Sequence, residues 1–150
     1  MTTEMTGEEK RAIEWYCQQL LNRITNLLDQ GRWQELADCY TEDATLARPS
    51  DPDNPFRGRA EILASLEARP PRTTCHLLTN SMFEVKSPTE VLAFSRVLLI
   101  SGDAGNGGAI ETANPLLVGS FTDELKKTGE GWQIHNRQGS IDIKYNPQTS

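Results

Sequence analysis

The sequence predicts an α+β fold in a single domain, because helical patterns come first and long strand-like patterns follow them. Its 150 residues are enough for one domain with one buried core. The composition, 37% hydrophobic and 24% charged, is that of a globular protein rather than a disordered or membrane-embedded one. No internal repeat or linker interrupts the chain, so we expect residues 1–150 to form one domain.

The first predicted element is an amphipathic helix between Thr6 and Gly31. Thr6 and Glu9 have the spacing of a capping box, and Gly31 is a suitable C-terminal stop. Between them, apolar residues recur at the helical period and define one face. These residues are Ile13, Tyr16, Cys17, Leu20, Leu21, Ile24, Leu27 and Leu28.

Shorter elements are predicted in the next forty residues. A second helix covers about residues 33–40, and a short strand covers residues 44–47. Residues 50–55 are predicted to be a loop, because they contain two prolines and three Asp or Asn residues. A third helix begins near Gly58 or Arg59 and ends before the prolines at positions 70 and 71.

The C-terminal half predicts four strands, rich in β-branched and aromatic residues and separated by turn-like segments. They cover residues 73–85, 90–101, 116–127 and 132–145. The Gly-rich segment 102–108 joins two of these strands and lacks the Gly-Lys-Ser/Thr ending of a phosphate-binding loop. We therefore expect a hairpin tip there.

Charge and patterning exclude several classes of partner. The net charge of −6 and the absence of a basic run argue against nucleic acid. The longest apolar stretch, residues 97–100, is far too short to span a membrane, and the N-terminus lacks the pattern of a signal peptide. Three widely spaced cysteines, Cys17, Cys39 and Cys75, indicate reduced thiols. We therefore expect a cytoplasmic protein.

Six short strings, in this order, resemble the SnoaL-like branch of the NTF2-like superfamily. They are LDQGRW (28–33), YTEDAT (40–45), FRGRAEI (56–62), CHLLTN (75–80), GSFTDE (119–124) and GWQI (131–134). The resemblance extends from about residue 8 to residue 145. It implies a cone-shaped fold in which the N-terminal helices pack on a curved antiparallel sheet and enclose a small-molecule pocket. It also implies association into a homodimer or homotrimer.

Asp29 and His76 are the candidate catalytic residues. Asp29 ends an apolar helical face, where a carboxylate needs a partner, and the resemblance to scytalone dehydratase-like enzymes implies an Asp–His dyad at these positions. An ionised Asp29 would orient His76, which could then move a proton. The alternative is that Asp29 caps the helix and His76 is structural. Leu28 stands where those enzymes have a tyrosine, and Arg96 where they have a second histidine.

Arg96 and several aromatic and amide side chains are candidates for substrate binding. Arg96 lies among apolar residues, where its charge needs a partner. It either contacts an anionic group or enolate of the substrate, or pairs with Asp123 or Glu124. The other candidates, with core packing as the alternative for each aromatic one, are Tyr16, Trp33, Tyr40, Phe56, Asn80, Asn114 and Phe121. We expect His135 to lie outside the pocket.

The function that these residues favour is acid–base catalysis without a cofactor. A dehydratase, dehydrohalogenase or isomerase acting on a small hydrophobic or cyclic substrate fits the Asp–His pair. A metal site is not expected, because two unrelated histidines without paired carboxylates do not make the usual ligand set. The alternatives are a non-catalytic ligand-binding domain and the β subunit of an aromatic-ring dioxygenase, which residues 76–80, 95–99 and 118–119 also resemble.

Overall fold

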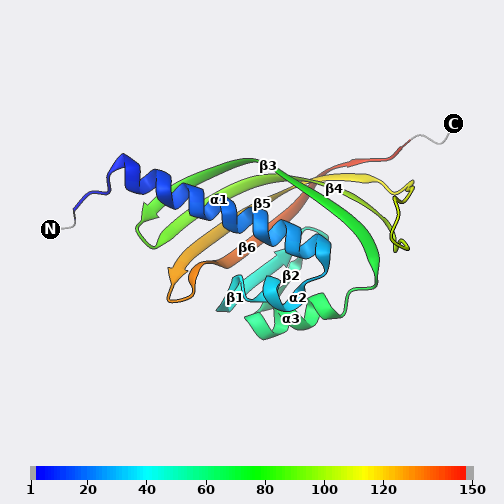
Figure 1. The fold of residues 1–150 in the computed structure, drawn as a ribbon, viewed down its shortest axis with the longest axis horizontal. Helices are drawn as coiled ribbons and strands as arrows, with labels where there is room; N and C mark the ends of the chain where they lie inside the picture. The colour runs from blue at the N-terminus through cyan, green and yellow to red at the C-terminus, as the bar shows by residue number, and fades with distance from the viewer. Residues whose placement is uncertain (1–2, 148–150) are drawn as a thin grey trace.

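The computed structural model describes residues 3–147, which form one curved six-stranded sheet and three helices (Figure 1). In chain order the elements are α1 (Gly7–Gln30), α2 (Trp33–Ala37), β1 (Tyr40–Arg48), β2 (Asp51–Arg57), α3 (Arg59–Glu67), β3 (Arg72–Ser87), β4 (Glu90–Asp103), β5 (Leu116–Thr128) and β6 (Gly131–Tyr145). α1 lies across one face of the sheet, and α2 and α3 lie together beside β1. The predicted α+β fold is confirmed.

The sheet is mixed rather than purely antiparallel, with the strand order β2-β1-β6-β5-β4-β3. The four long strands β3 to β6 form antiparallel hairpins, as the turn-like segments between them predict. β1 instead pairs in parallel with β6. These two strands lie far apart in the sequence, so no hairpin turn forces them to run in opposite directions. The expectation of an antiparallel sheet is corrected at this one pairing.

The predicted loop at residues 50–55 is wrong, because Asp51–Arg57 forms strand β2. β2 is at the edge of the sheet and pairs only with β1, so its prolines remove no hydrogen bond from an inner ladder. The neighbouring elements also differ from expectation. α2 ends at Ala37, and Tyr40, predicted as its last residue, already belongs to β1.

The capping prediction for α1 is confirmed. The Thr6 hydroxyl accepts a hydrogen bond from the Glu9 amide at 3.1 Å, and the Glu9 carboxylate accepts one from the Thr6 amide at 2.7 Å. Gly31 ends the helix with φ of 68°, a left-handed conformation that costs glycine little. These caps fix where the last turn of α1, and with it Asp29, lies over the sheet.

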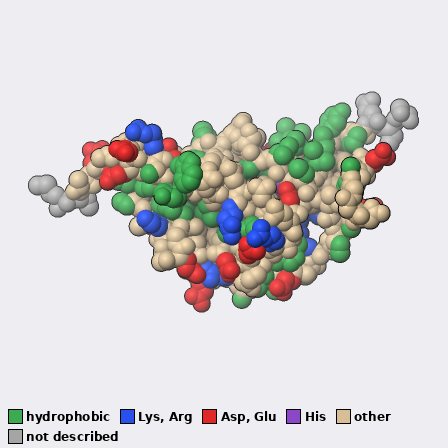
Figure 2. Space-filling model, viewed as in Figure 1, with side chains coloured by type: hydrophobic (Ala, Val, Ile, Leu, Met, Phe, Trp, Pro, Cys, Tyr) green, Lys and Arg blue, Asp and Glu red, His purple; other side chains and the backbone are tan. Residues whose placement is uncertain are grey.

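The core lies between α1 and the inner face of the sheet. Leu21 and Ile24 of α1 pack there against Ile62 of α3 and Ile134 of β6, and all four side chains are buried. Tyr16 was predicted on this apolar face, but its side chain is 57% exposed beside Trp15. Figure 2 shows hydrophobic side chains gathered on the surface over this first half of α1.

The outer face of the sheet also exposes apolar side chains. Leu77 and Met82 of β3 and Ile143 and Tyr145 of β6 are each at least half exposed. The association into a homodimer or homotrimer stays a prediction, and this face is the surface that it would bury. Light scattering of the purified protein tests it, and a monomer at micromolar concentration would contradict it.

Candidate active site

Asp29 and His76 touch at the rim of the core. Asp29 lies in the last turn of α1, and His76 lies on the inner face of β3. The Asp29 Oδ1 atom is 2.5 Å from His76 Nδ1, and Asp29 Oδ2 accepts a hydrogen bond from the His76 amide at 2.8 Å. Thr74, two residues before His76 on the same face, donates its hydroxyl proton to Asp29 Oδ1 at 2.8 Å. The Asp29 carboxylate is therefore bound by residues of β3. The C-terminal cap of α1 is Gly31 and not Asp29.

These hydrogen bonds stabilise the ionised form of Asp29. Burial by itself would raise the pKa of the Asp29 carboxyl, but the hydrogen bonds from His76 and Thr74 outweigh it and lower the pKa below its ordinary value. An ionised Asp29 can only accept, so the neutral His76 ring must carry its proton on Nδ1. Nε2 has no hydrogen-bond partner within residues 3–147, which leaves this nitrogen for a ligand.

The lowered pKa of Asp29 predicts a pH dependence of stability. Because the folded protein prefers the ionised carboxyl, this contribution is fully present above the ordinary aspartate pKa of about 4 and is lost as the pH falls below it. The difference in unfolding free energy between wild type and Asp29→Asn should thus persist from pH 7 to 5 and shrink below about pH 4. Denaturant titrations at each pH measure it. A difference that grows below pH 4 would contradict the assignment.

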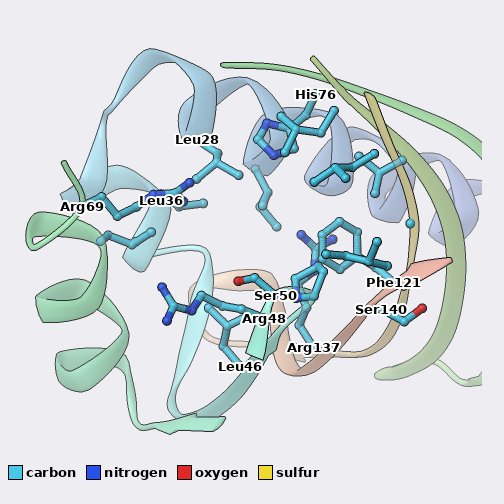
Figure 3. Close-up of a pocket in the computed structure, with 18 of the residues that line it drawn as sticks. Leu28, Leu36, Leu46, Arg48, Ser50, Arg69, His76, Phe121, Arg137 and Ser140 are labelled. Atoms are coloured by element: carbon cyan, nitrogen blue, oxygen red, sulfur yellow. The ribbon is translucent and has the colours of Figure 1, made fainter. Parts of the chain in front are cut away.

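His76 lies in the wall of a pocket of about 380 Å³, a size that suits a small molecule (Figure 3). Most of the wall is apolar and comes from α1, α2, β1, α3, β4, β5 and β6. Its large apolar side chains are those of Ile24, Leu28, Leu36, Leu46, Leu66, Val97, Leu99, Leu117, Phe121 and Ile141. Ser50, Pro70 and Arg72 also line the pocket and are exposed, so the cavity opens to solvent at their end.

A buried ion pair also contributes to the wall of the pocket. Arg137 of β6 donates from Nε to Asp123 Oδ1 at 2.8 Å and from Nη2 to Asp123 Oδ2 at 3.0 Å. Both side chains are almost fully buried, and the Arg137 guanidinium stacks 3.9 Å from the ring centre of Phe121. Burial alone would lower the pKa of Arg137, but Asp123 raises it, so this arginine stays charged. Arg137 lines the pocket.

Tyr40 and Phe121 are the two predicted substrate contacts that the structure places in the pocket lining. Both are buried. Burial raises the pKa of Tyr40 to about 12, against the opposing effect of Arg137, so the phenol keeps its proton at neutral pH. Tyr40 can therefore donate a hydrogen bond. Tyr16, Asn80 and Asn114 are exposed and lie outside the lining.

Trp33 and Phe56 do not line the pocket but contact residues that do. The Arg69 guanidinium lies 5.9 Å from the ring centre of Trp33, and the Arg48 guanidinium lies 4.7 Å from that of Phe56. Arg48 and Arg69 both belong to the pocket lining. Their predicted contact with a substrate stays a prediction, and in this structure the two rings lie against arginines of the lining.

Arg96 lies on the other face of the sheet, outside the lining of this pocket. On β4, Ser95 and Val97 point inward and are buried, whereas Arg96 points outward. Its predicted pairing with Asp123 or Glu124 is wrong, because Arg96 contacts Asp142 at 3.2 Å. Asp123 pairs instead with Arg137.

Four arginines of the pocket lining were not predicted from the sequence: Arg48, Arg69, Arg72 and Arg137. The first three come from three separate segments, the end of β1, the turn after α3 and the start of β3. The signal that could have found Arg72 is period-two alternation, which puts it on the same face as Thr74 and His76. His135 lies outside the lining, where its Nδ1 atom is 3.0 Å from the Thr41 hydroxyl.

The described residues contain neither a cluster of metal ligands nor a membrane-spanning helix. Across residues 3–147 no cluster of three or more His, Cys, Asp or Glu could hold a metal ion. None of the helices in the same range is long and apolar enough to cross a membrane. Cys17, Cys39 and Cys75 all have free thiols.

Comparison with solved structures identifies the fold. A candidate scytalone dehydratase from Novosphingobium aromaticivorans is similar with a TM-score of 0.81 and 20% sequence identity, over 97% of this chain and 94% of that one. A hexachlorocyclohexane dehydrochlorinase, LinA-type3, from Novosphingobium barchaimii is similar with a TM-score of 0.78 and 16% identity, over 97% of both chains. A protein of unknown function with a cystatin-like fold from Nostoc punctiforme has a TM-score of 0.69 and 17% identity, over 95% of this chain and 98% of that one.

At these identities the likeness shows the fold and not the activity. Comparison with curated proteins finds no match. The sequence profile described as a SnoaL-like domain matches residues 10–138, most of the chain, in agreement with the resemblance seen in the six strings. The protein therefore belongs to the family of SnoaL-like domains.

Proposed function

We propose that the protein is a cofactor-independent acid–base enzyme that eliminates water or hydrogen halide from a small hydrophobic or cyclic substrate, or isomerises it. The observation that carries the proposal is the contact between Asp29 and His76 in the wall of a largely apolar pocket. The names of two similar structures, a candidate scytalone dehydratase and a dehydrochlorinase, point to the same class of reaction.

His76 acts first as a general base. Asp29 holds the proton on Nδ1, so Nε2 presents its lone pair to the substrate and takes a proton from a carbon made acidic by a neighbouring carbonyl or halogen. The electron pair of the broken C–H bond forms the new double bond. In an elimination the leaving group departs with the electrons of its own bond, and in an isomerisation the proton returns to a different carbon.

The same ring then acts as an acid. If the leaving group is hydroxide, the proton on Nε2 converts it to water, and if it is a halide, the proton passes to solvent. Arg137 and Tyr40 lie in the pocket lining, one with a fixed positive charge and the other with a protonated hydroxyl. We assign to them the stabilisation of negative charge that develops on a carbonyl oxygen or a leaving group.

The test is a screen of β-hydroxy ketones, vicinal halides and β,γ-unsaturated ketones in deuterium oxide, followed by NMR. We expect turnover of at least one class. His76→Gln should lower kcat/KM by about 10²- to 10⁴-fold, the usual contribution of a general acid–base group. His135→Gln is the matched control, because the other histidine of the chain lies outside the pocket lining. It should keep full activity.

Three results would contradict the proposal. Equal losses in His76→Gln and His135→Gln would show that the dyad has no special role. Binding of the test compounds without turnover would favour a non-catalytic ligand-binding domain. Activity that required an added Rieske-type large subunit would instead favour the β subunit of a dioxygenase.

A further inference from the structure

The charges in the pocket lining differ in sign from those of the whole chain. The protein has a net charge of −6, yet the four arginines of the lining face no carboxylate among the lining residues of the described chain. The positive charge of Arg137 is balanced by its buried ion pair with Asp123, which is not a lining residue. The other three, Arg48, Arg69 and Arg72, form no ion pair within residues 3–147. We call these three the arginine rim, because they lie with exposed residues at the open end of the pocket.

Two members of the arginine rim are held in place without being neutralised. The Arg48 guanidinium lies 4.7 Å from the ring centre of Phe56, and the Arg69 guanidinium lies 5.9 Å from that of Trp33. Both distances are within the cation–π range, and this interaction leaves the positive charge in place. The Nε atom of Arg48 is buried and has no hydrogen-bond partner among the described residues. A buried charged donor without a partner is costly, and a bound oxyanion would remove that cost.

The rim residues also repel one another. The pKa of Arg69 is lowered, mainly by burial and then by the charges of Arg72 and Arg48, which outweigh the attraction of Asp29. Asp29 attracts Arg69 but forms no ion pair with any of the three among the described residues, and its oxygens instead accept hydrogen bonds from His76 and Thr74. Three like charges collected at one opening, without an ion-pair partner among residues 3–147, are unfavourable in the empty pocket. A bound anion would offset the repulsion among these three positive charges.

We propose that the substrate of this pocket carries an oxyanion, a carboxylate or a phosphate, which Arg48, Arg69 and Arg72 bind at the open end. The guanidinium fork matches both groups in geometry. Figure 3 shows Arg48 and Arg69 on one side of the pocket, with Phe121 on the other and His76 between these sides. An anion held at the rim therefore leaves the apolar part of the molecule against the inner wall, within reach of His76. This inference rests on the proposed function, because it names the substrate class of the same site.

Binding of three matched naphthalene probes tests the proposal. The probes are 2-naphthoate, 2-naphthyl phosphate and the neutral 2-naphthamide, each titrated by calorimetry at low and high salt. We expect at least one anion to bind about 10-fold or more tightly than the amide, since hydrogen bonds to charged groups contribute about 1.5–3 kcal/mol each. The preferred anion tells carboxylate from phosphate. Its advantage should shrink at high salt.

Single substitutions locate the binding group. Arg48→Gln and Arg69→Gln should each weaken the preferred anion about 10-fold and leave the amide unchanged, which also shows that the variants are folded. Arg57→Gln removes the same charge from β2 outside the pocket lining and should change nothing. The proposal fails if the amide binds as tightly as both anions, if neither anion binds at millimolar concentration, or if Arg57→Gln has the same effect as the rim variants.

The same assay separates this proposal from the proposed function. His76→Gln should keep the preference for the anionic probe over the amide, because the three arginines and not His76 hold the anion. Suppose that the protein binds the anions no better than the amide, but that it turns over neutral substrates and loses this activity in His76→Gln. Then the assignment of the arginine rim as an anion site fails and the acid–base function stands. If the anion binds through the rim but no compound is turned over, the acid–base function fails and the pocket is a binding site for organic anions.

Discussion

Replacing Asp29 by Asn is expected to lower kcat/KM by about 10²- to 10³-fold on any substrate that the wild type turns over, within the range of general acid–base catalysis. The carboxylate now accepts from His76 Nδ1 at 2.5 Å, from the His76 amide and from the Thr74 hydroxyl. An Asn side chain retains the shape but replaces one acceptor oxygen by an NH2 group, which only donates. The His76 ring would then favour the proton on Nε2, the nitrogen that must accept the substrate proton.

A double variant distinguishes this mechanism from a general disturbance of the pocket. Because Asp29 acts through His76, the variant with both Asp29→Asn and His76→Gln should lose no more activity than His76→Gln alone. KM should change less than kcat in Asp29→Asn, since Asp29 is not itself in the pocket lining. Losses that multiply in the double variant would mean that the two residues act independently, and would contradict the dyad.

The largest loss of stability is expected from Asp123→Asn. Asp123 is 0% exposed and Arg137 is 4% exposed, and two hydrogen bonds join them. Removing the negative charge leaves a buried guanidinium without its counter-ion, which typically costs about 3–5 kcal/mol of unfolding free energy. Urea denaturation followed by tryptophan fluorescence measures the effect.

The exposed ion pair between Arg96 and Asp142 provides the control for that prediction. The pair lies on the outer face of the sheet and both side chains are accessible to solvent. Asp142→Asn should therefore cost less than about 1 kcal/mol, the range of surface salt bridges. Substituting Asp123→Leu together with Arg137→Met should recover much of the stability lost in Asp123→Asn, because no buried charge remains. Equal costs for Asp123→Asn and Asp142→Asn would contradict the burial of the pair.

The features that could be predicted from the sequence are those carried by local patterns. The capping box at Thr6 and the glycine at position 31 fix the ends of α1, and the turn-like segments separate the four long strands as expected. Asp29 stood out because a carboxylate ended an apolar helical face. Its partner on β3 required the family resemblance, since α1 and β3 are separated by more than forty residues and nothing local links them.

The residues that were missed depend on non-local geometry. Extending the register of the β5–β6 turn, where Thr128 is opposite Gly131, would place Asp123 opposite Asn136. An irregularity between Glu124 and Leu125 shifts the register by one residue and brings Asp123 opposite Arg137. The sequence has no marker for that bulge, so the buried ion pair could not be predicted.

Arg96 was assigned to the wrong face for a related reason. β4 carries apolar residues on both faces, with Ala93 and Val97 inward and Phe94 and Leu98 outward, so alternation does not reveal which face is the inner one. The arginine rim could not be found from spacing either. Its members come from β1, the turn after α3 and β3, and only the closed fold brings them to one opening.

The most direct test of the central claim is the tautomer of His76, read from the nitrogen chemical shifts and two-bond couplings of the neutral imidazole. If Asp29 orients His76 as a base, the proton is on Nδ1 and Nε2 is unprotonated, and Asp29→Asn shifts the population toward the Nε2–H form. His135 provides an internal reference in the same spectrum. A His76 ring with its proton on Nε2 in the wild type, or one that Asp29→Asn leaves unchanged, would contradict the account.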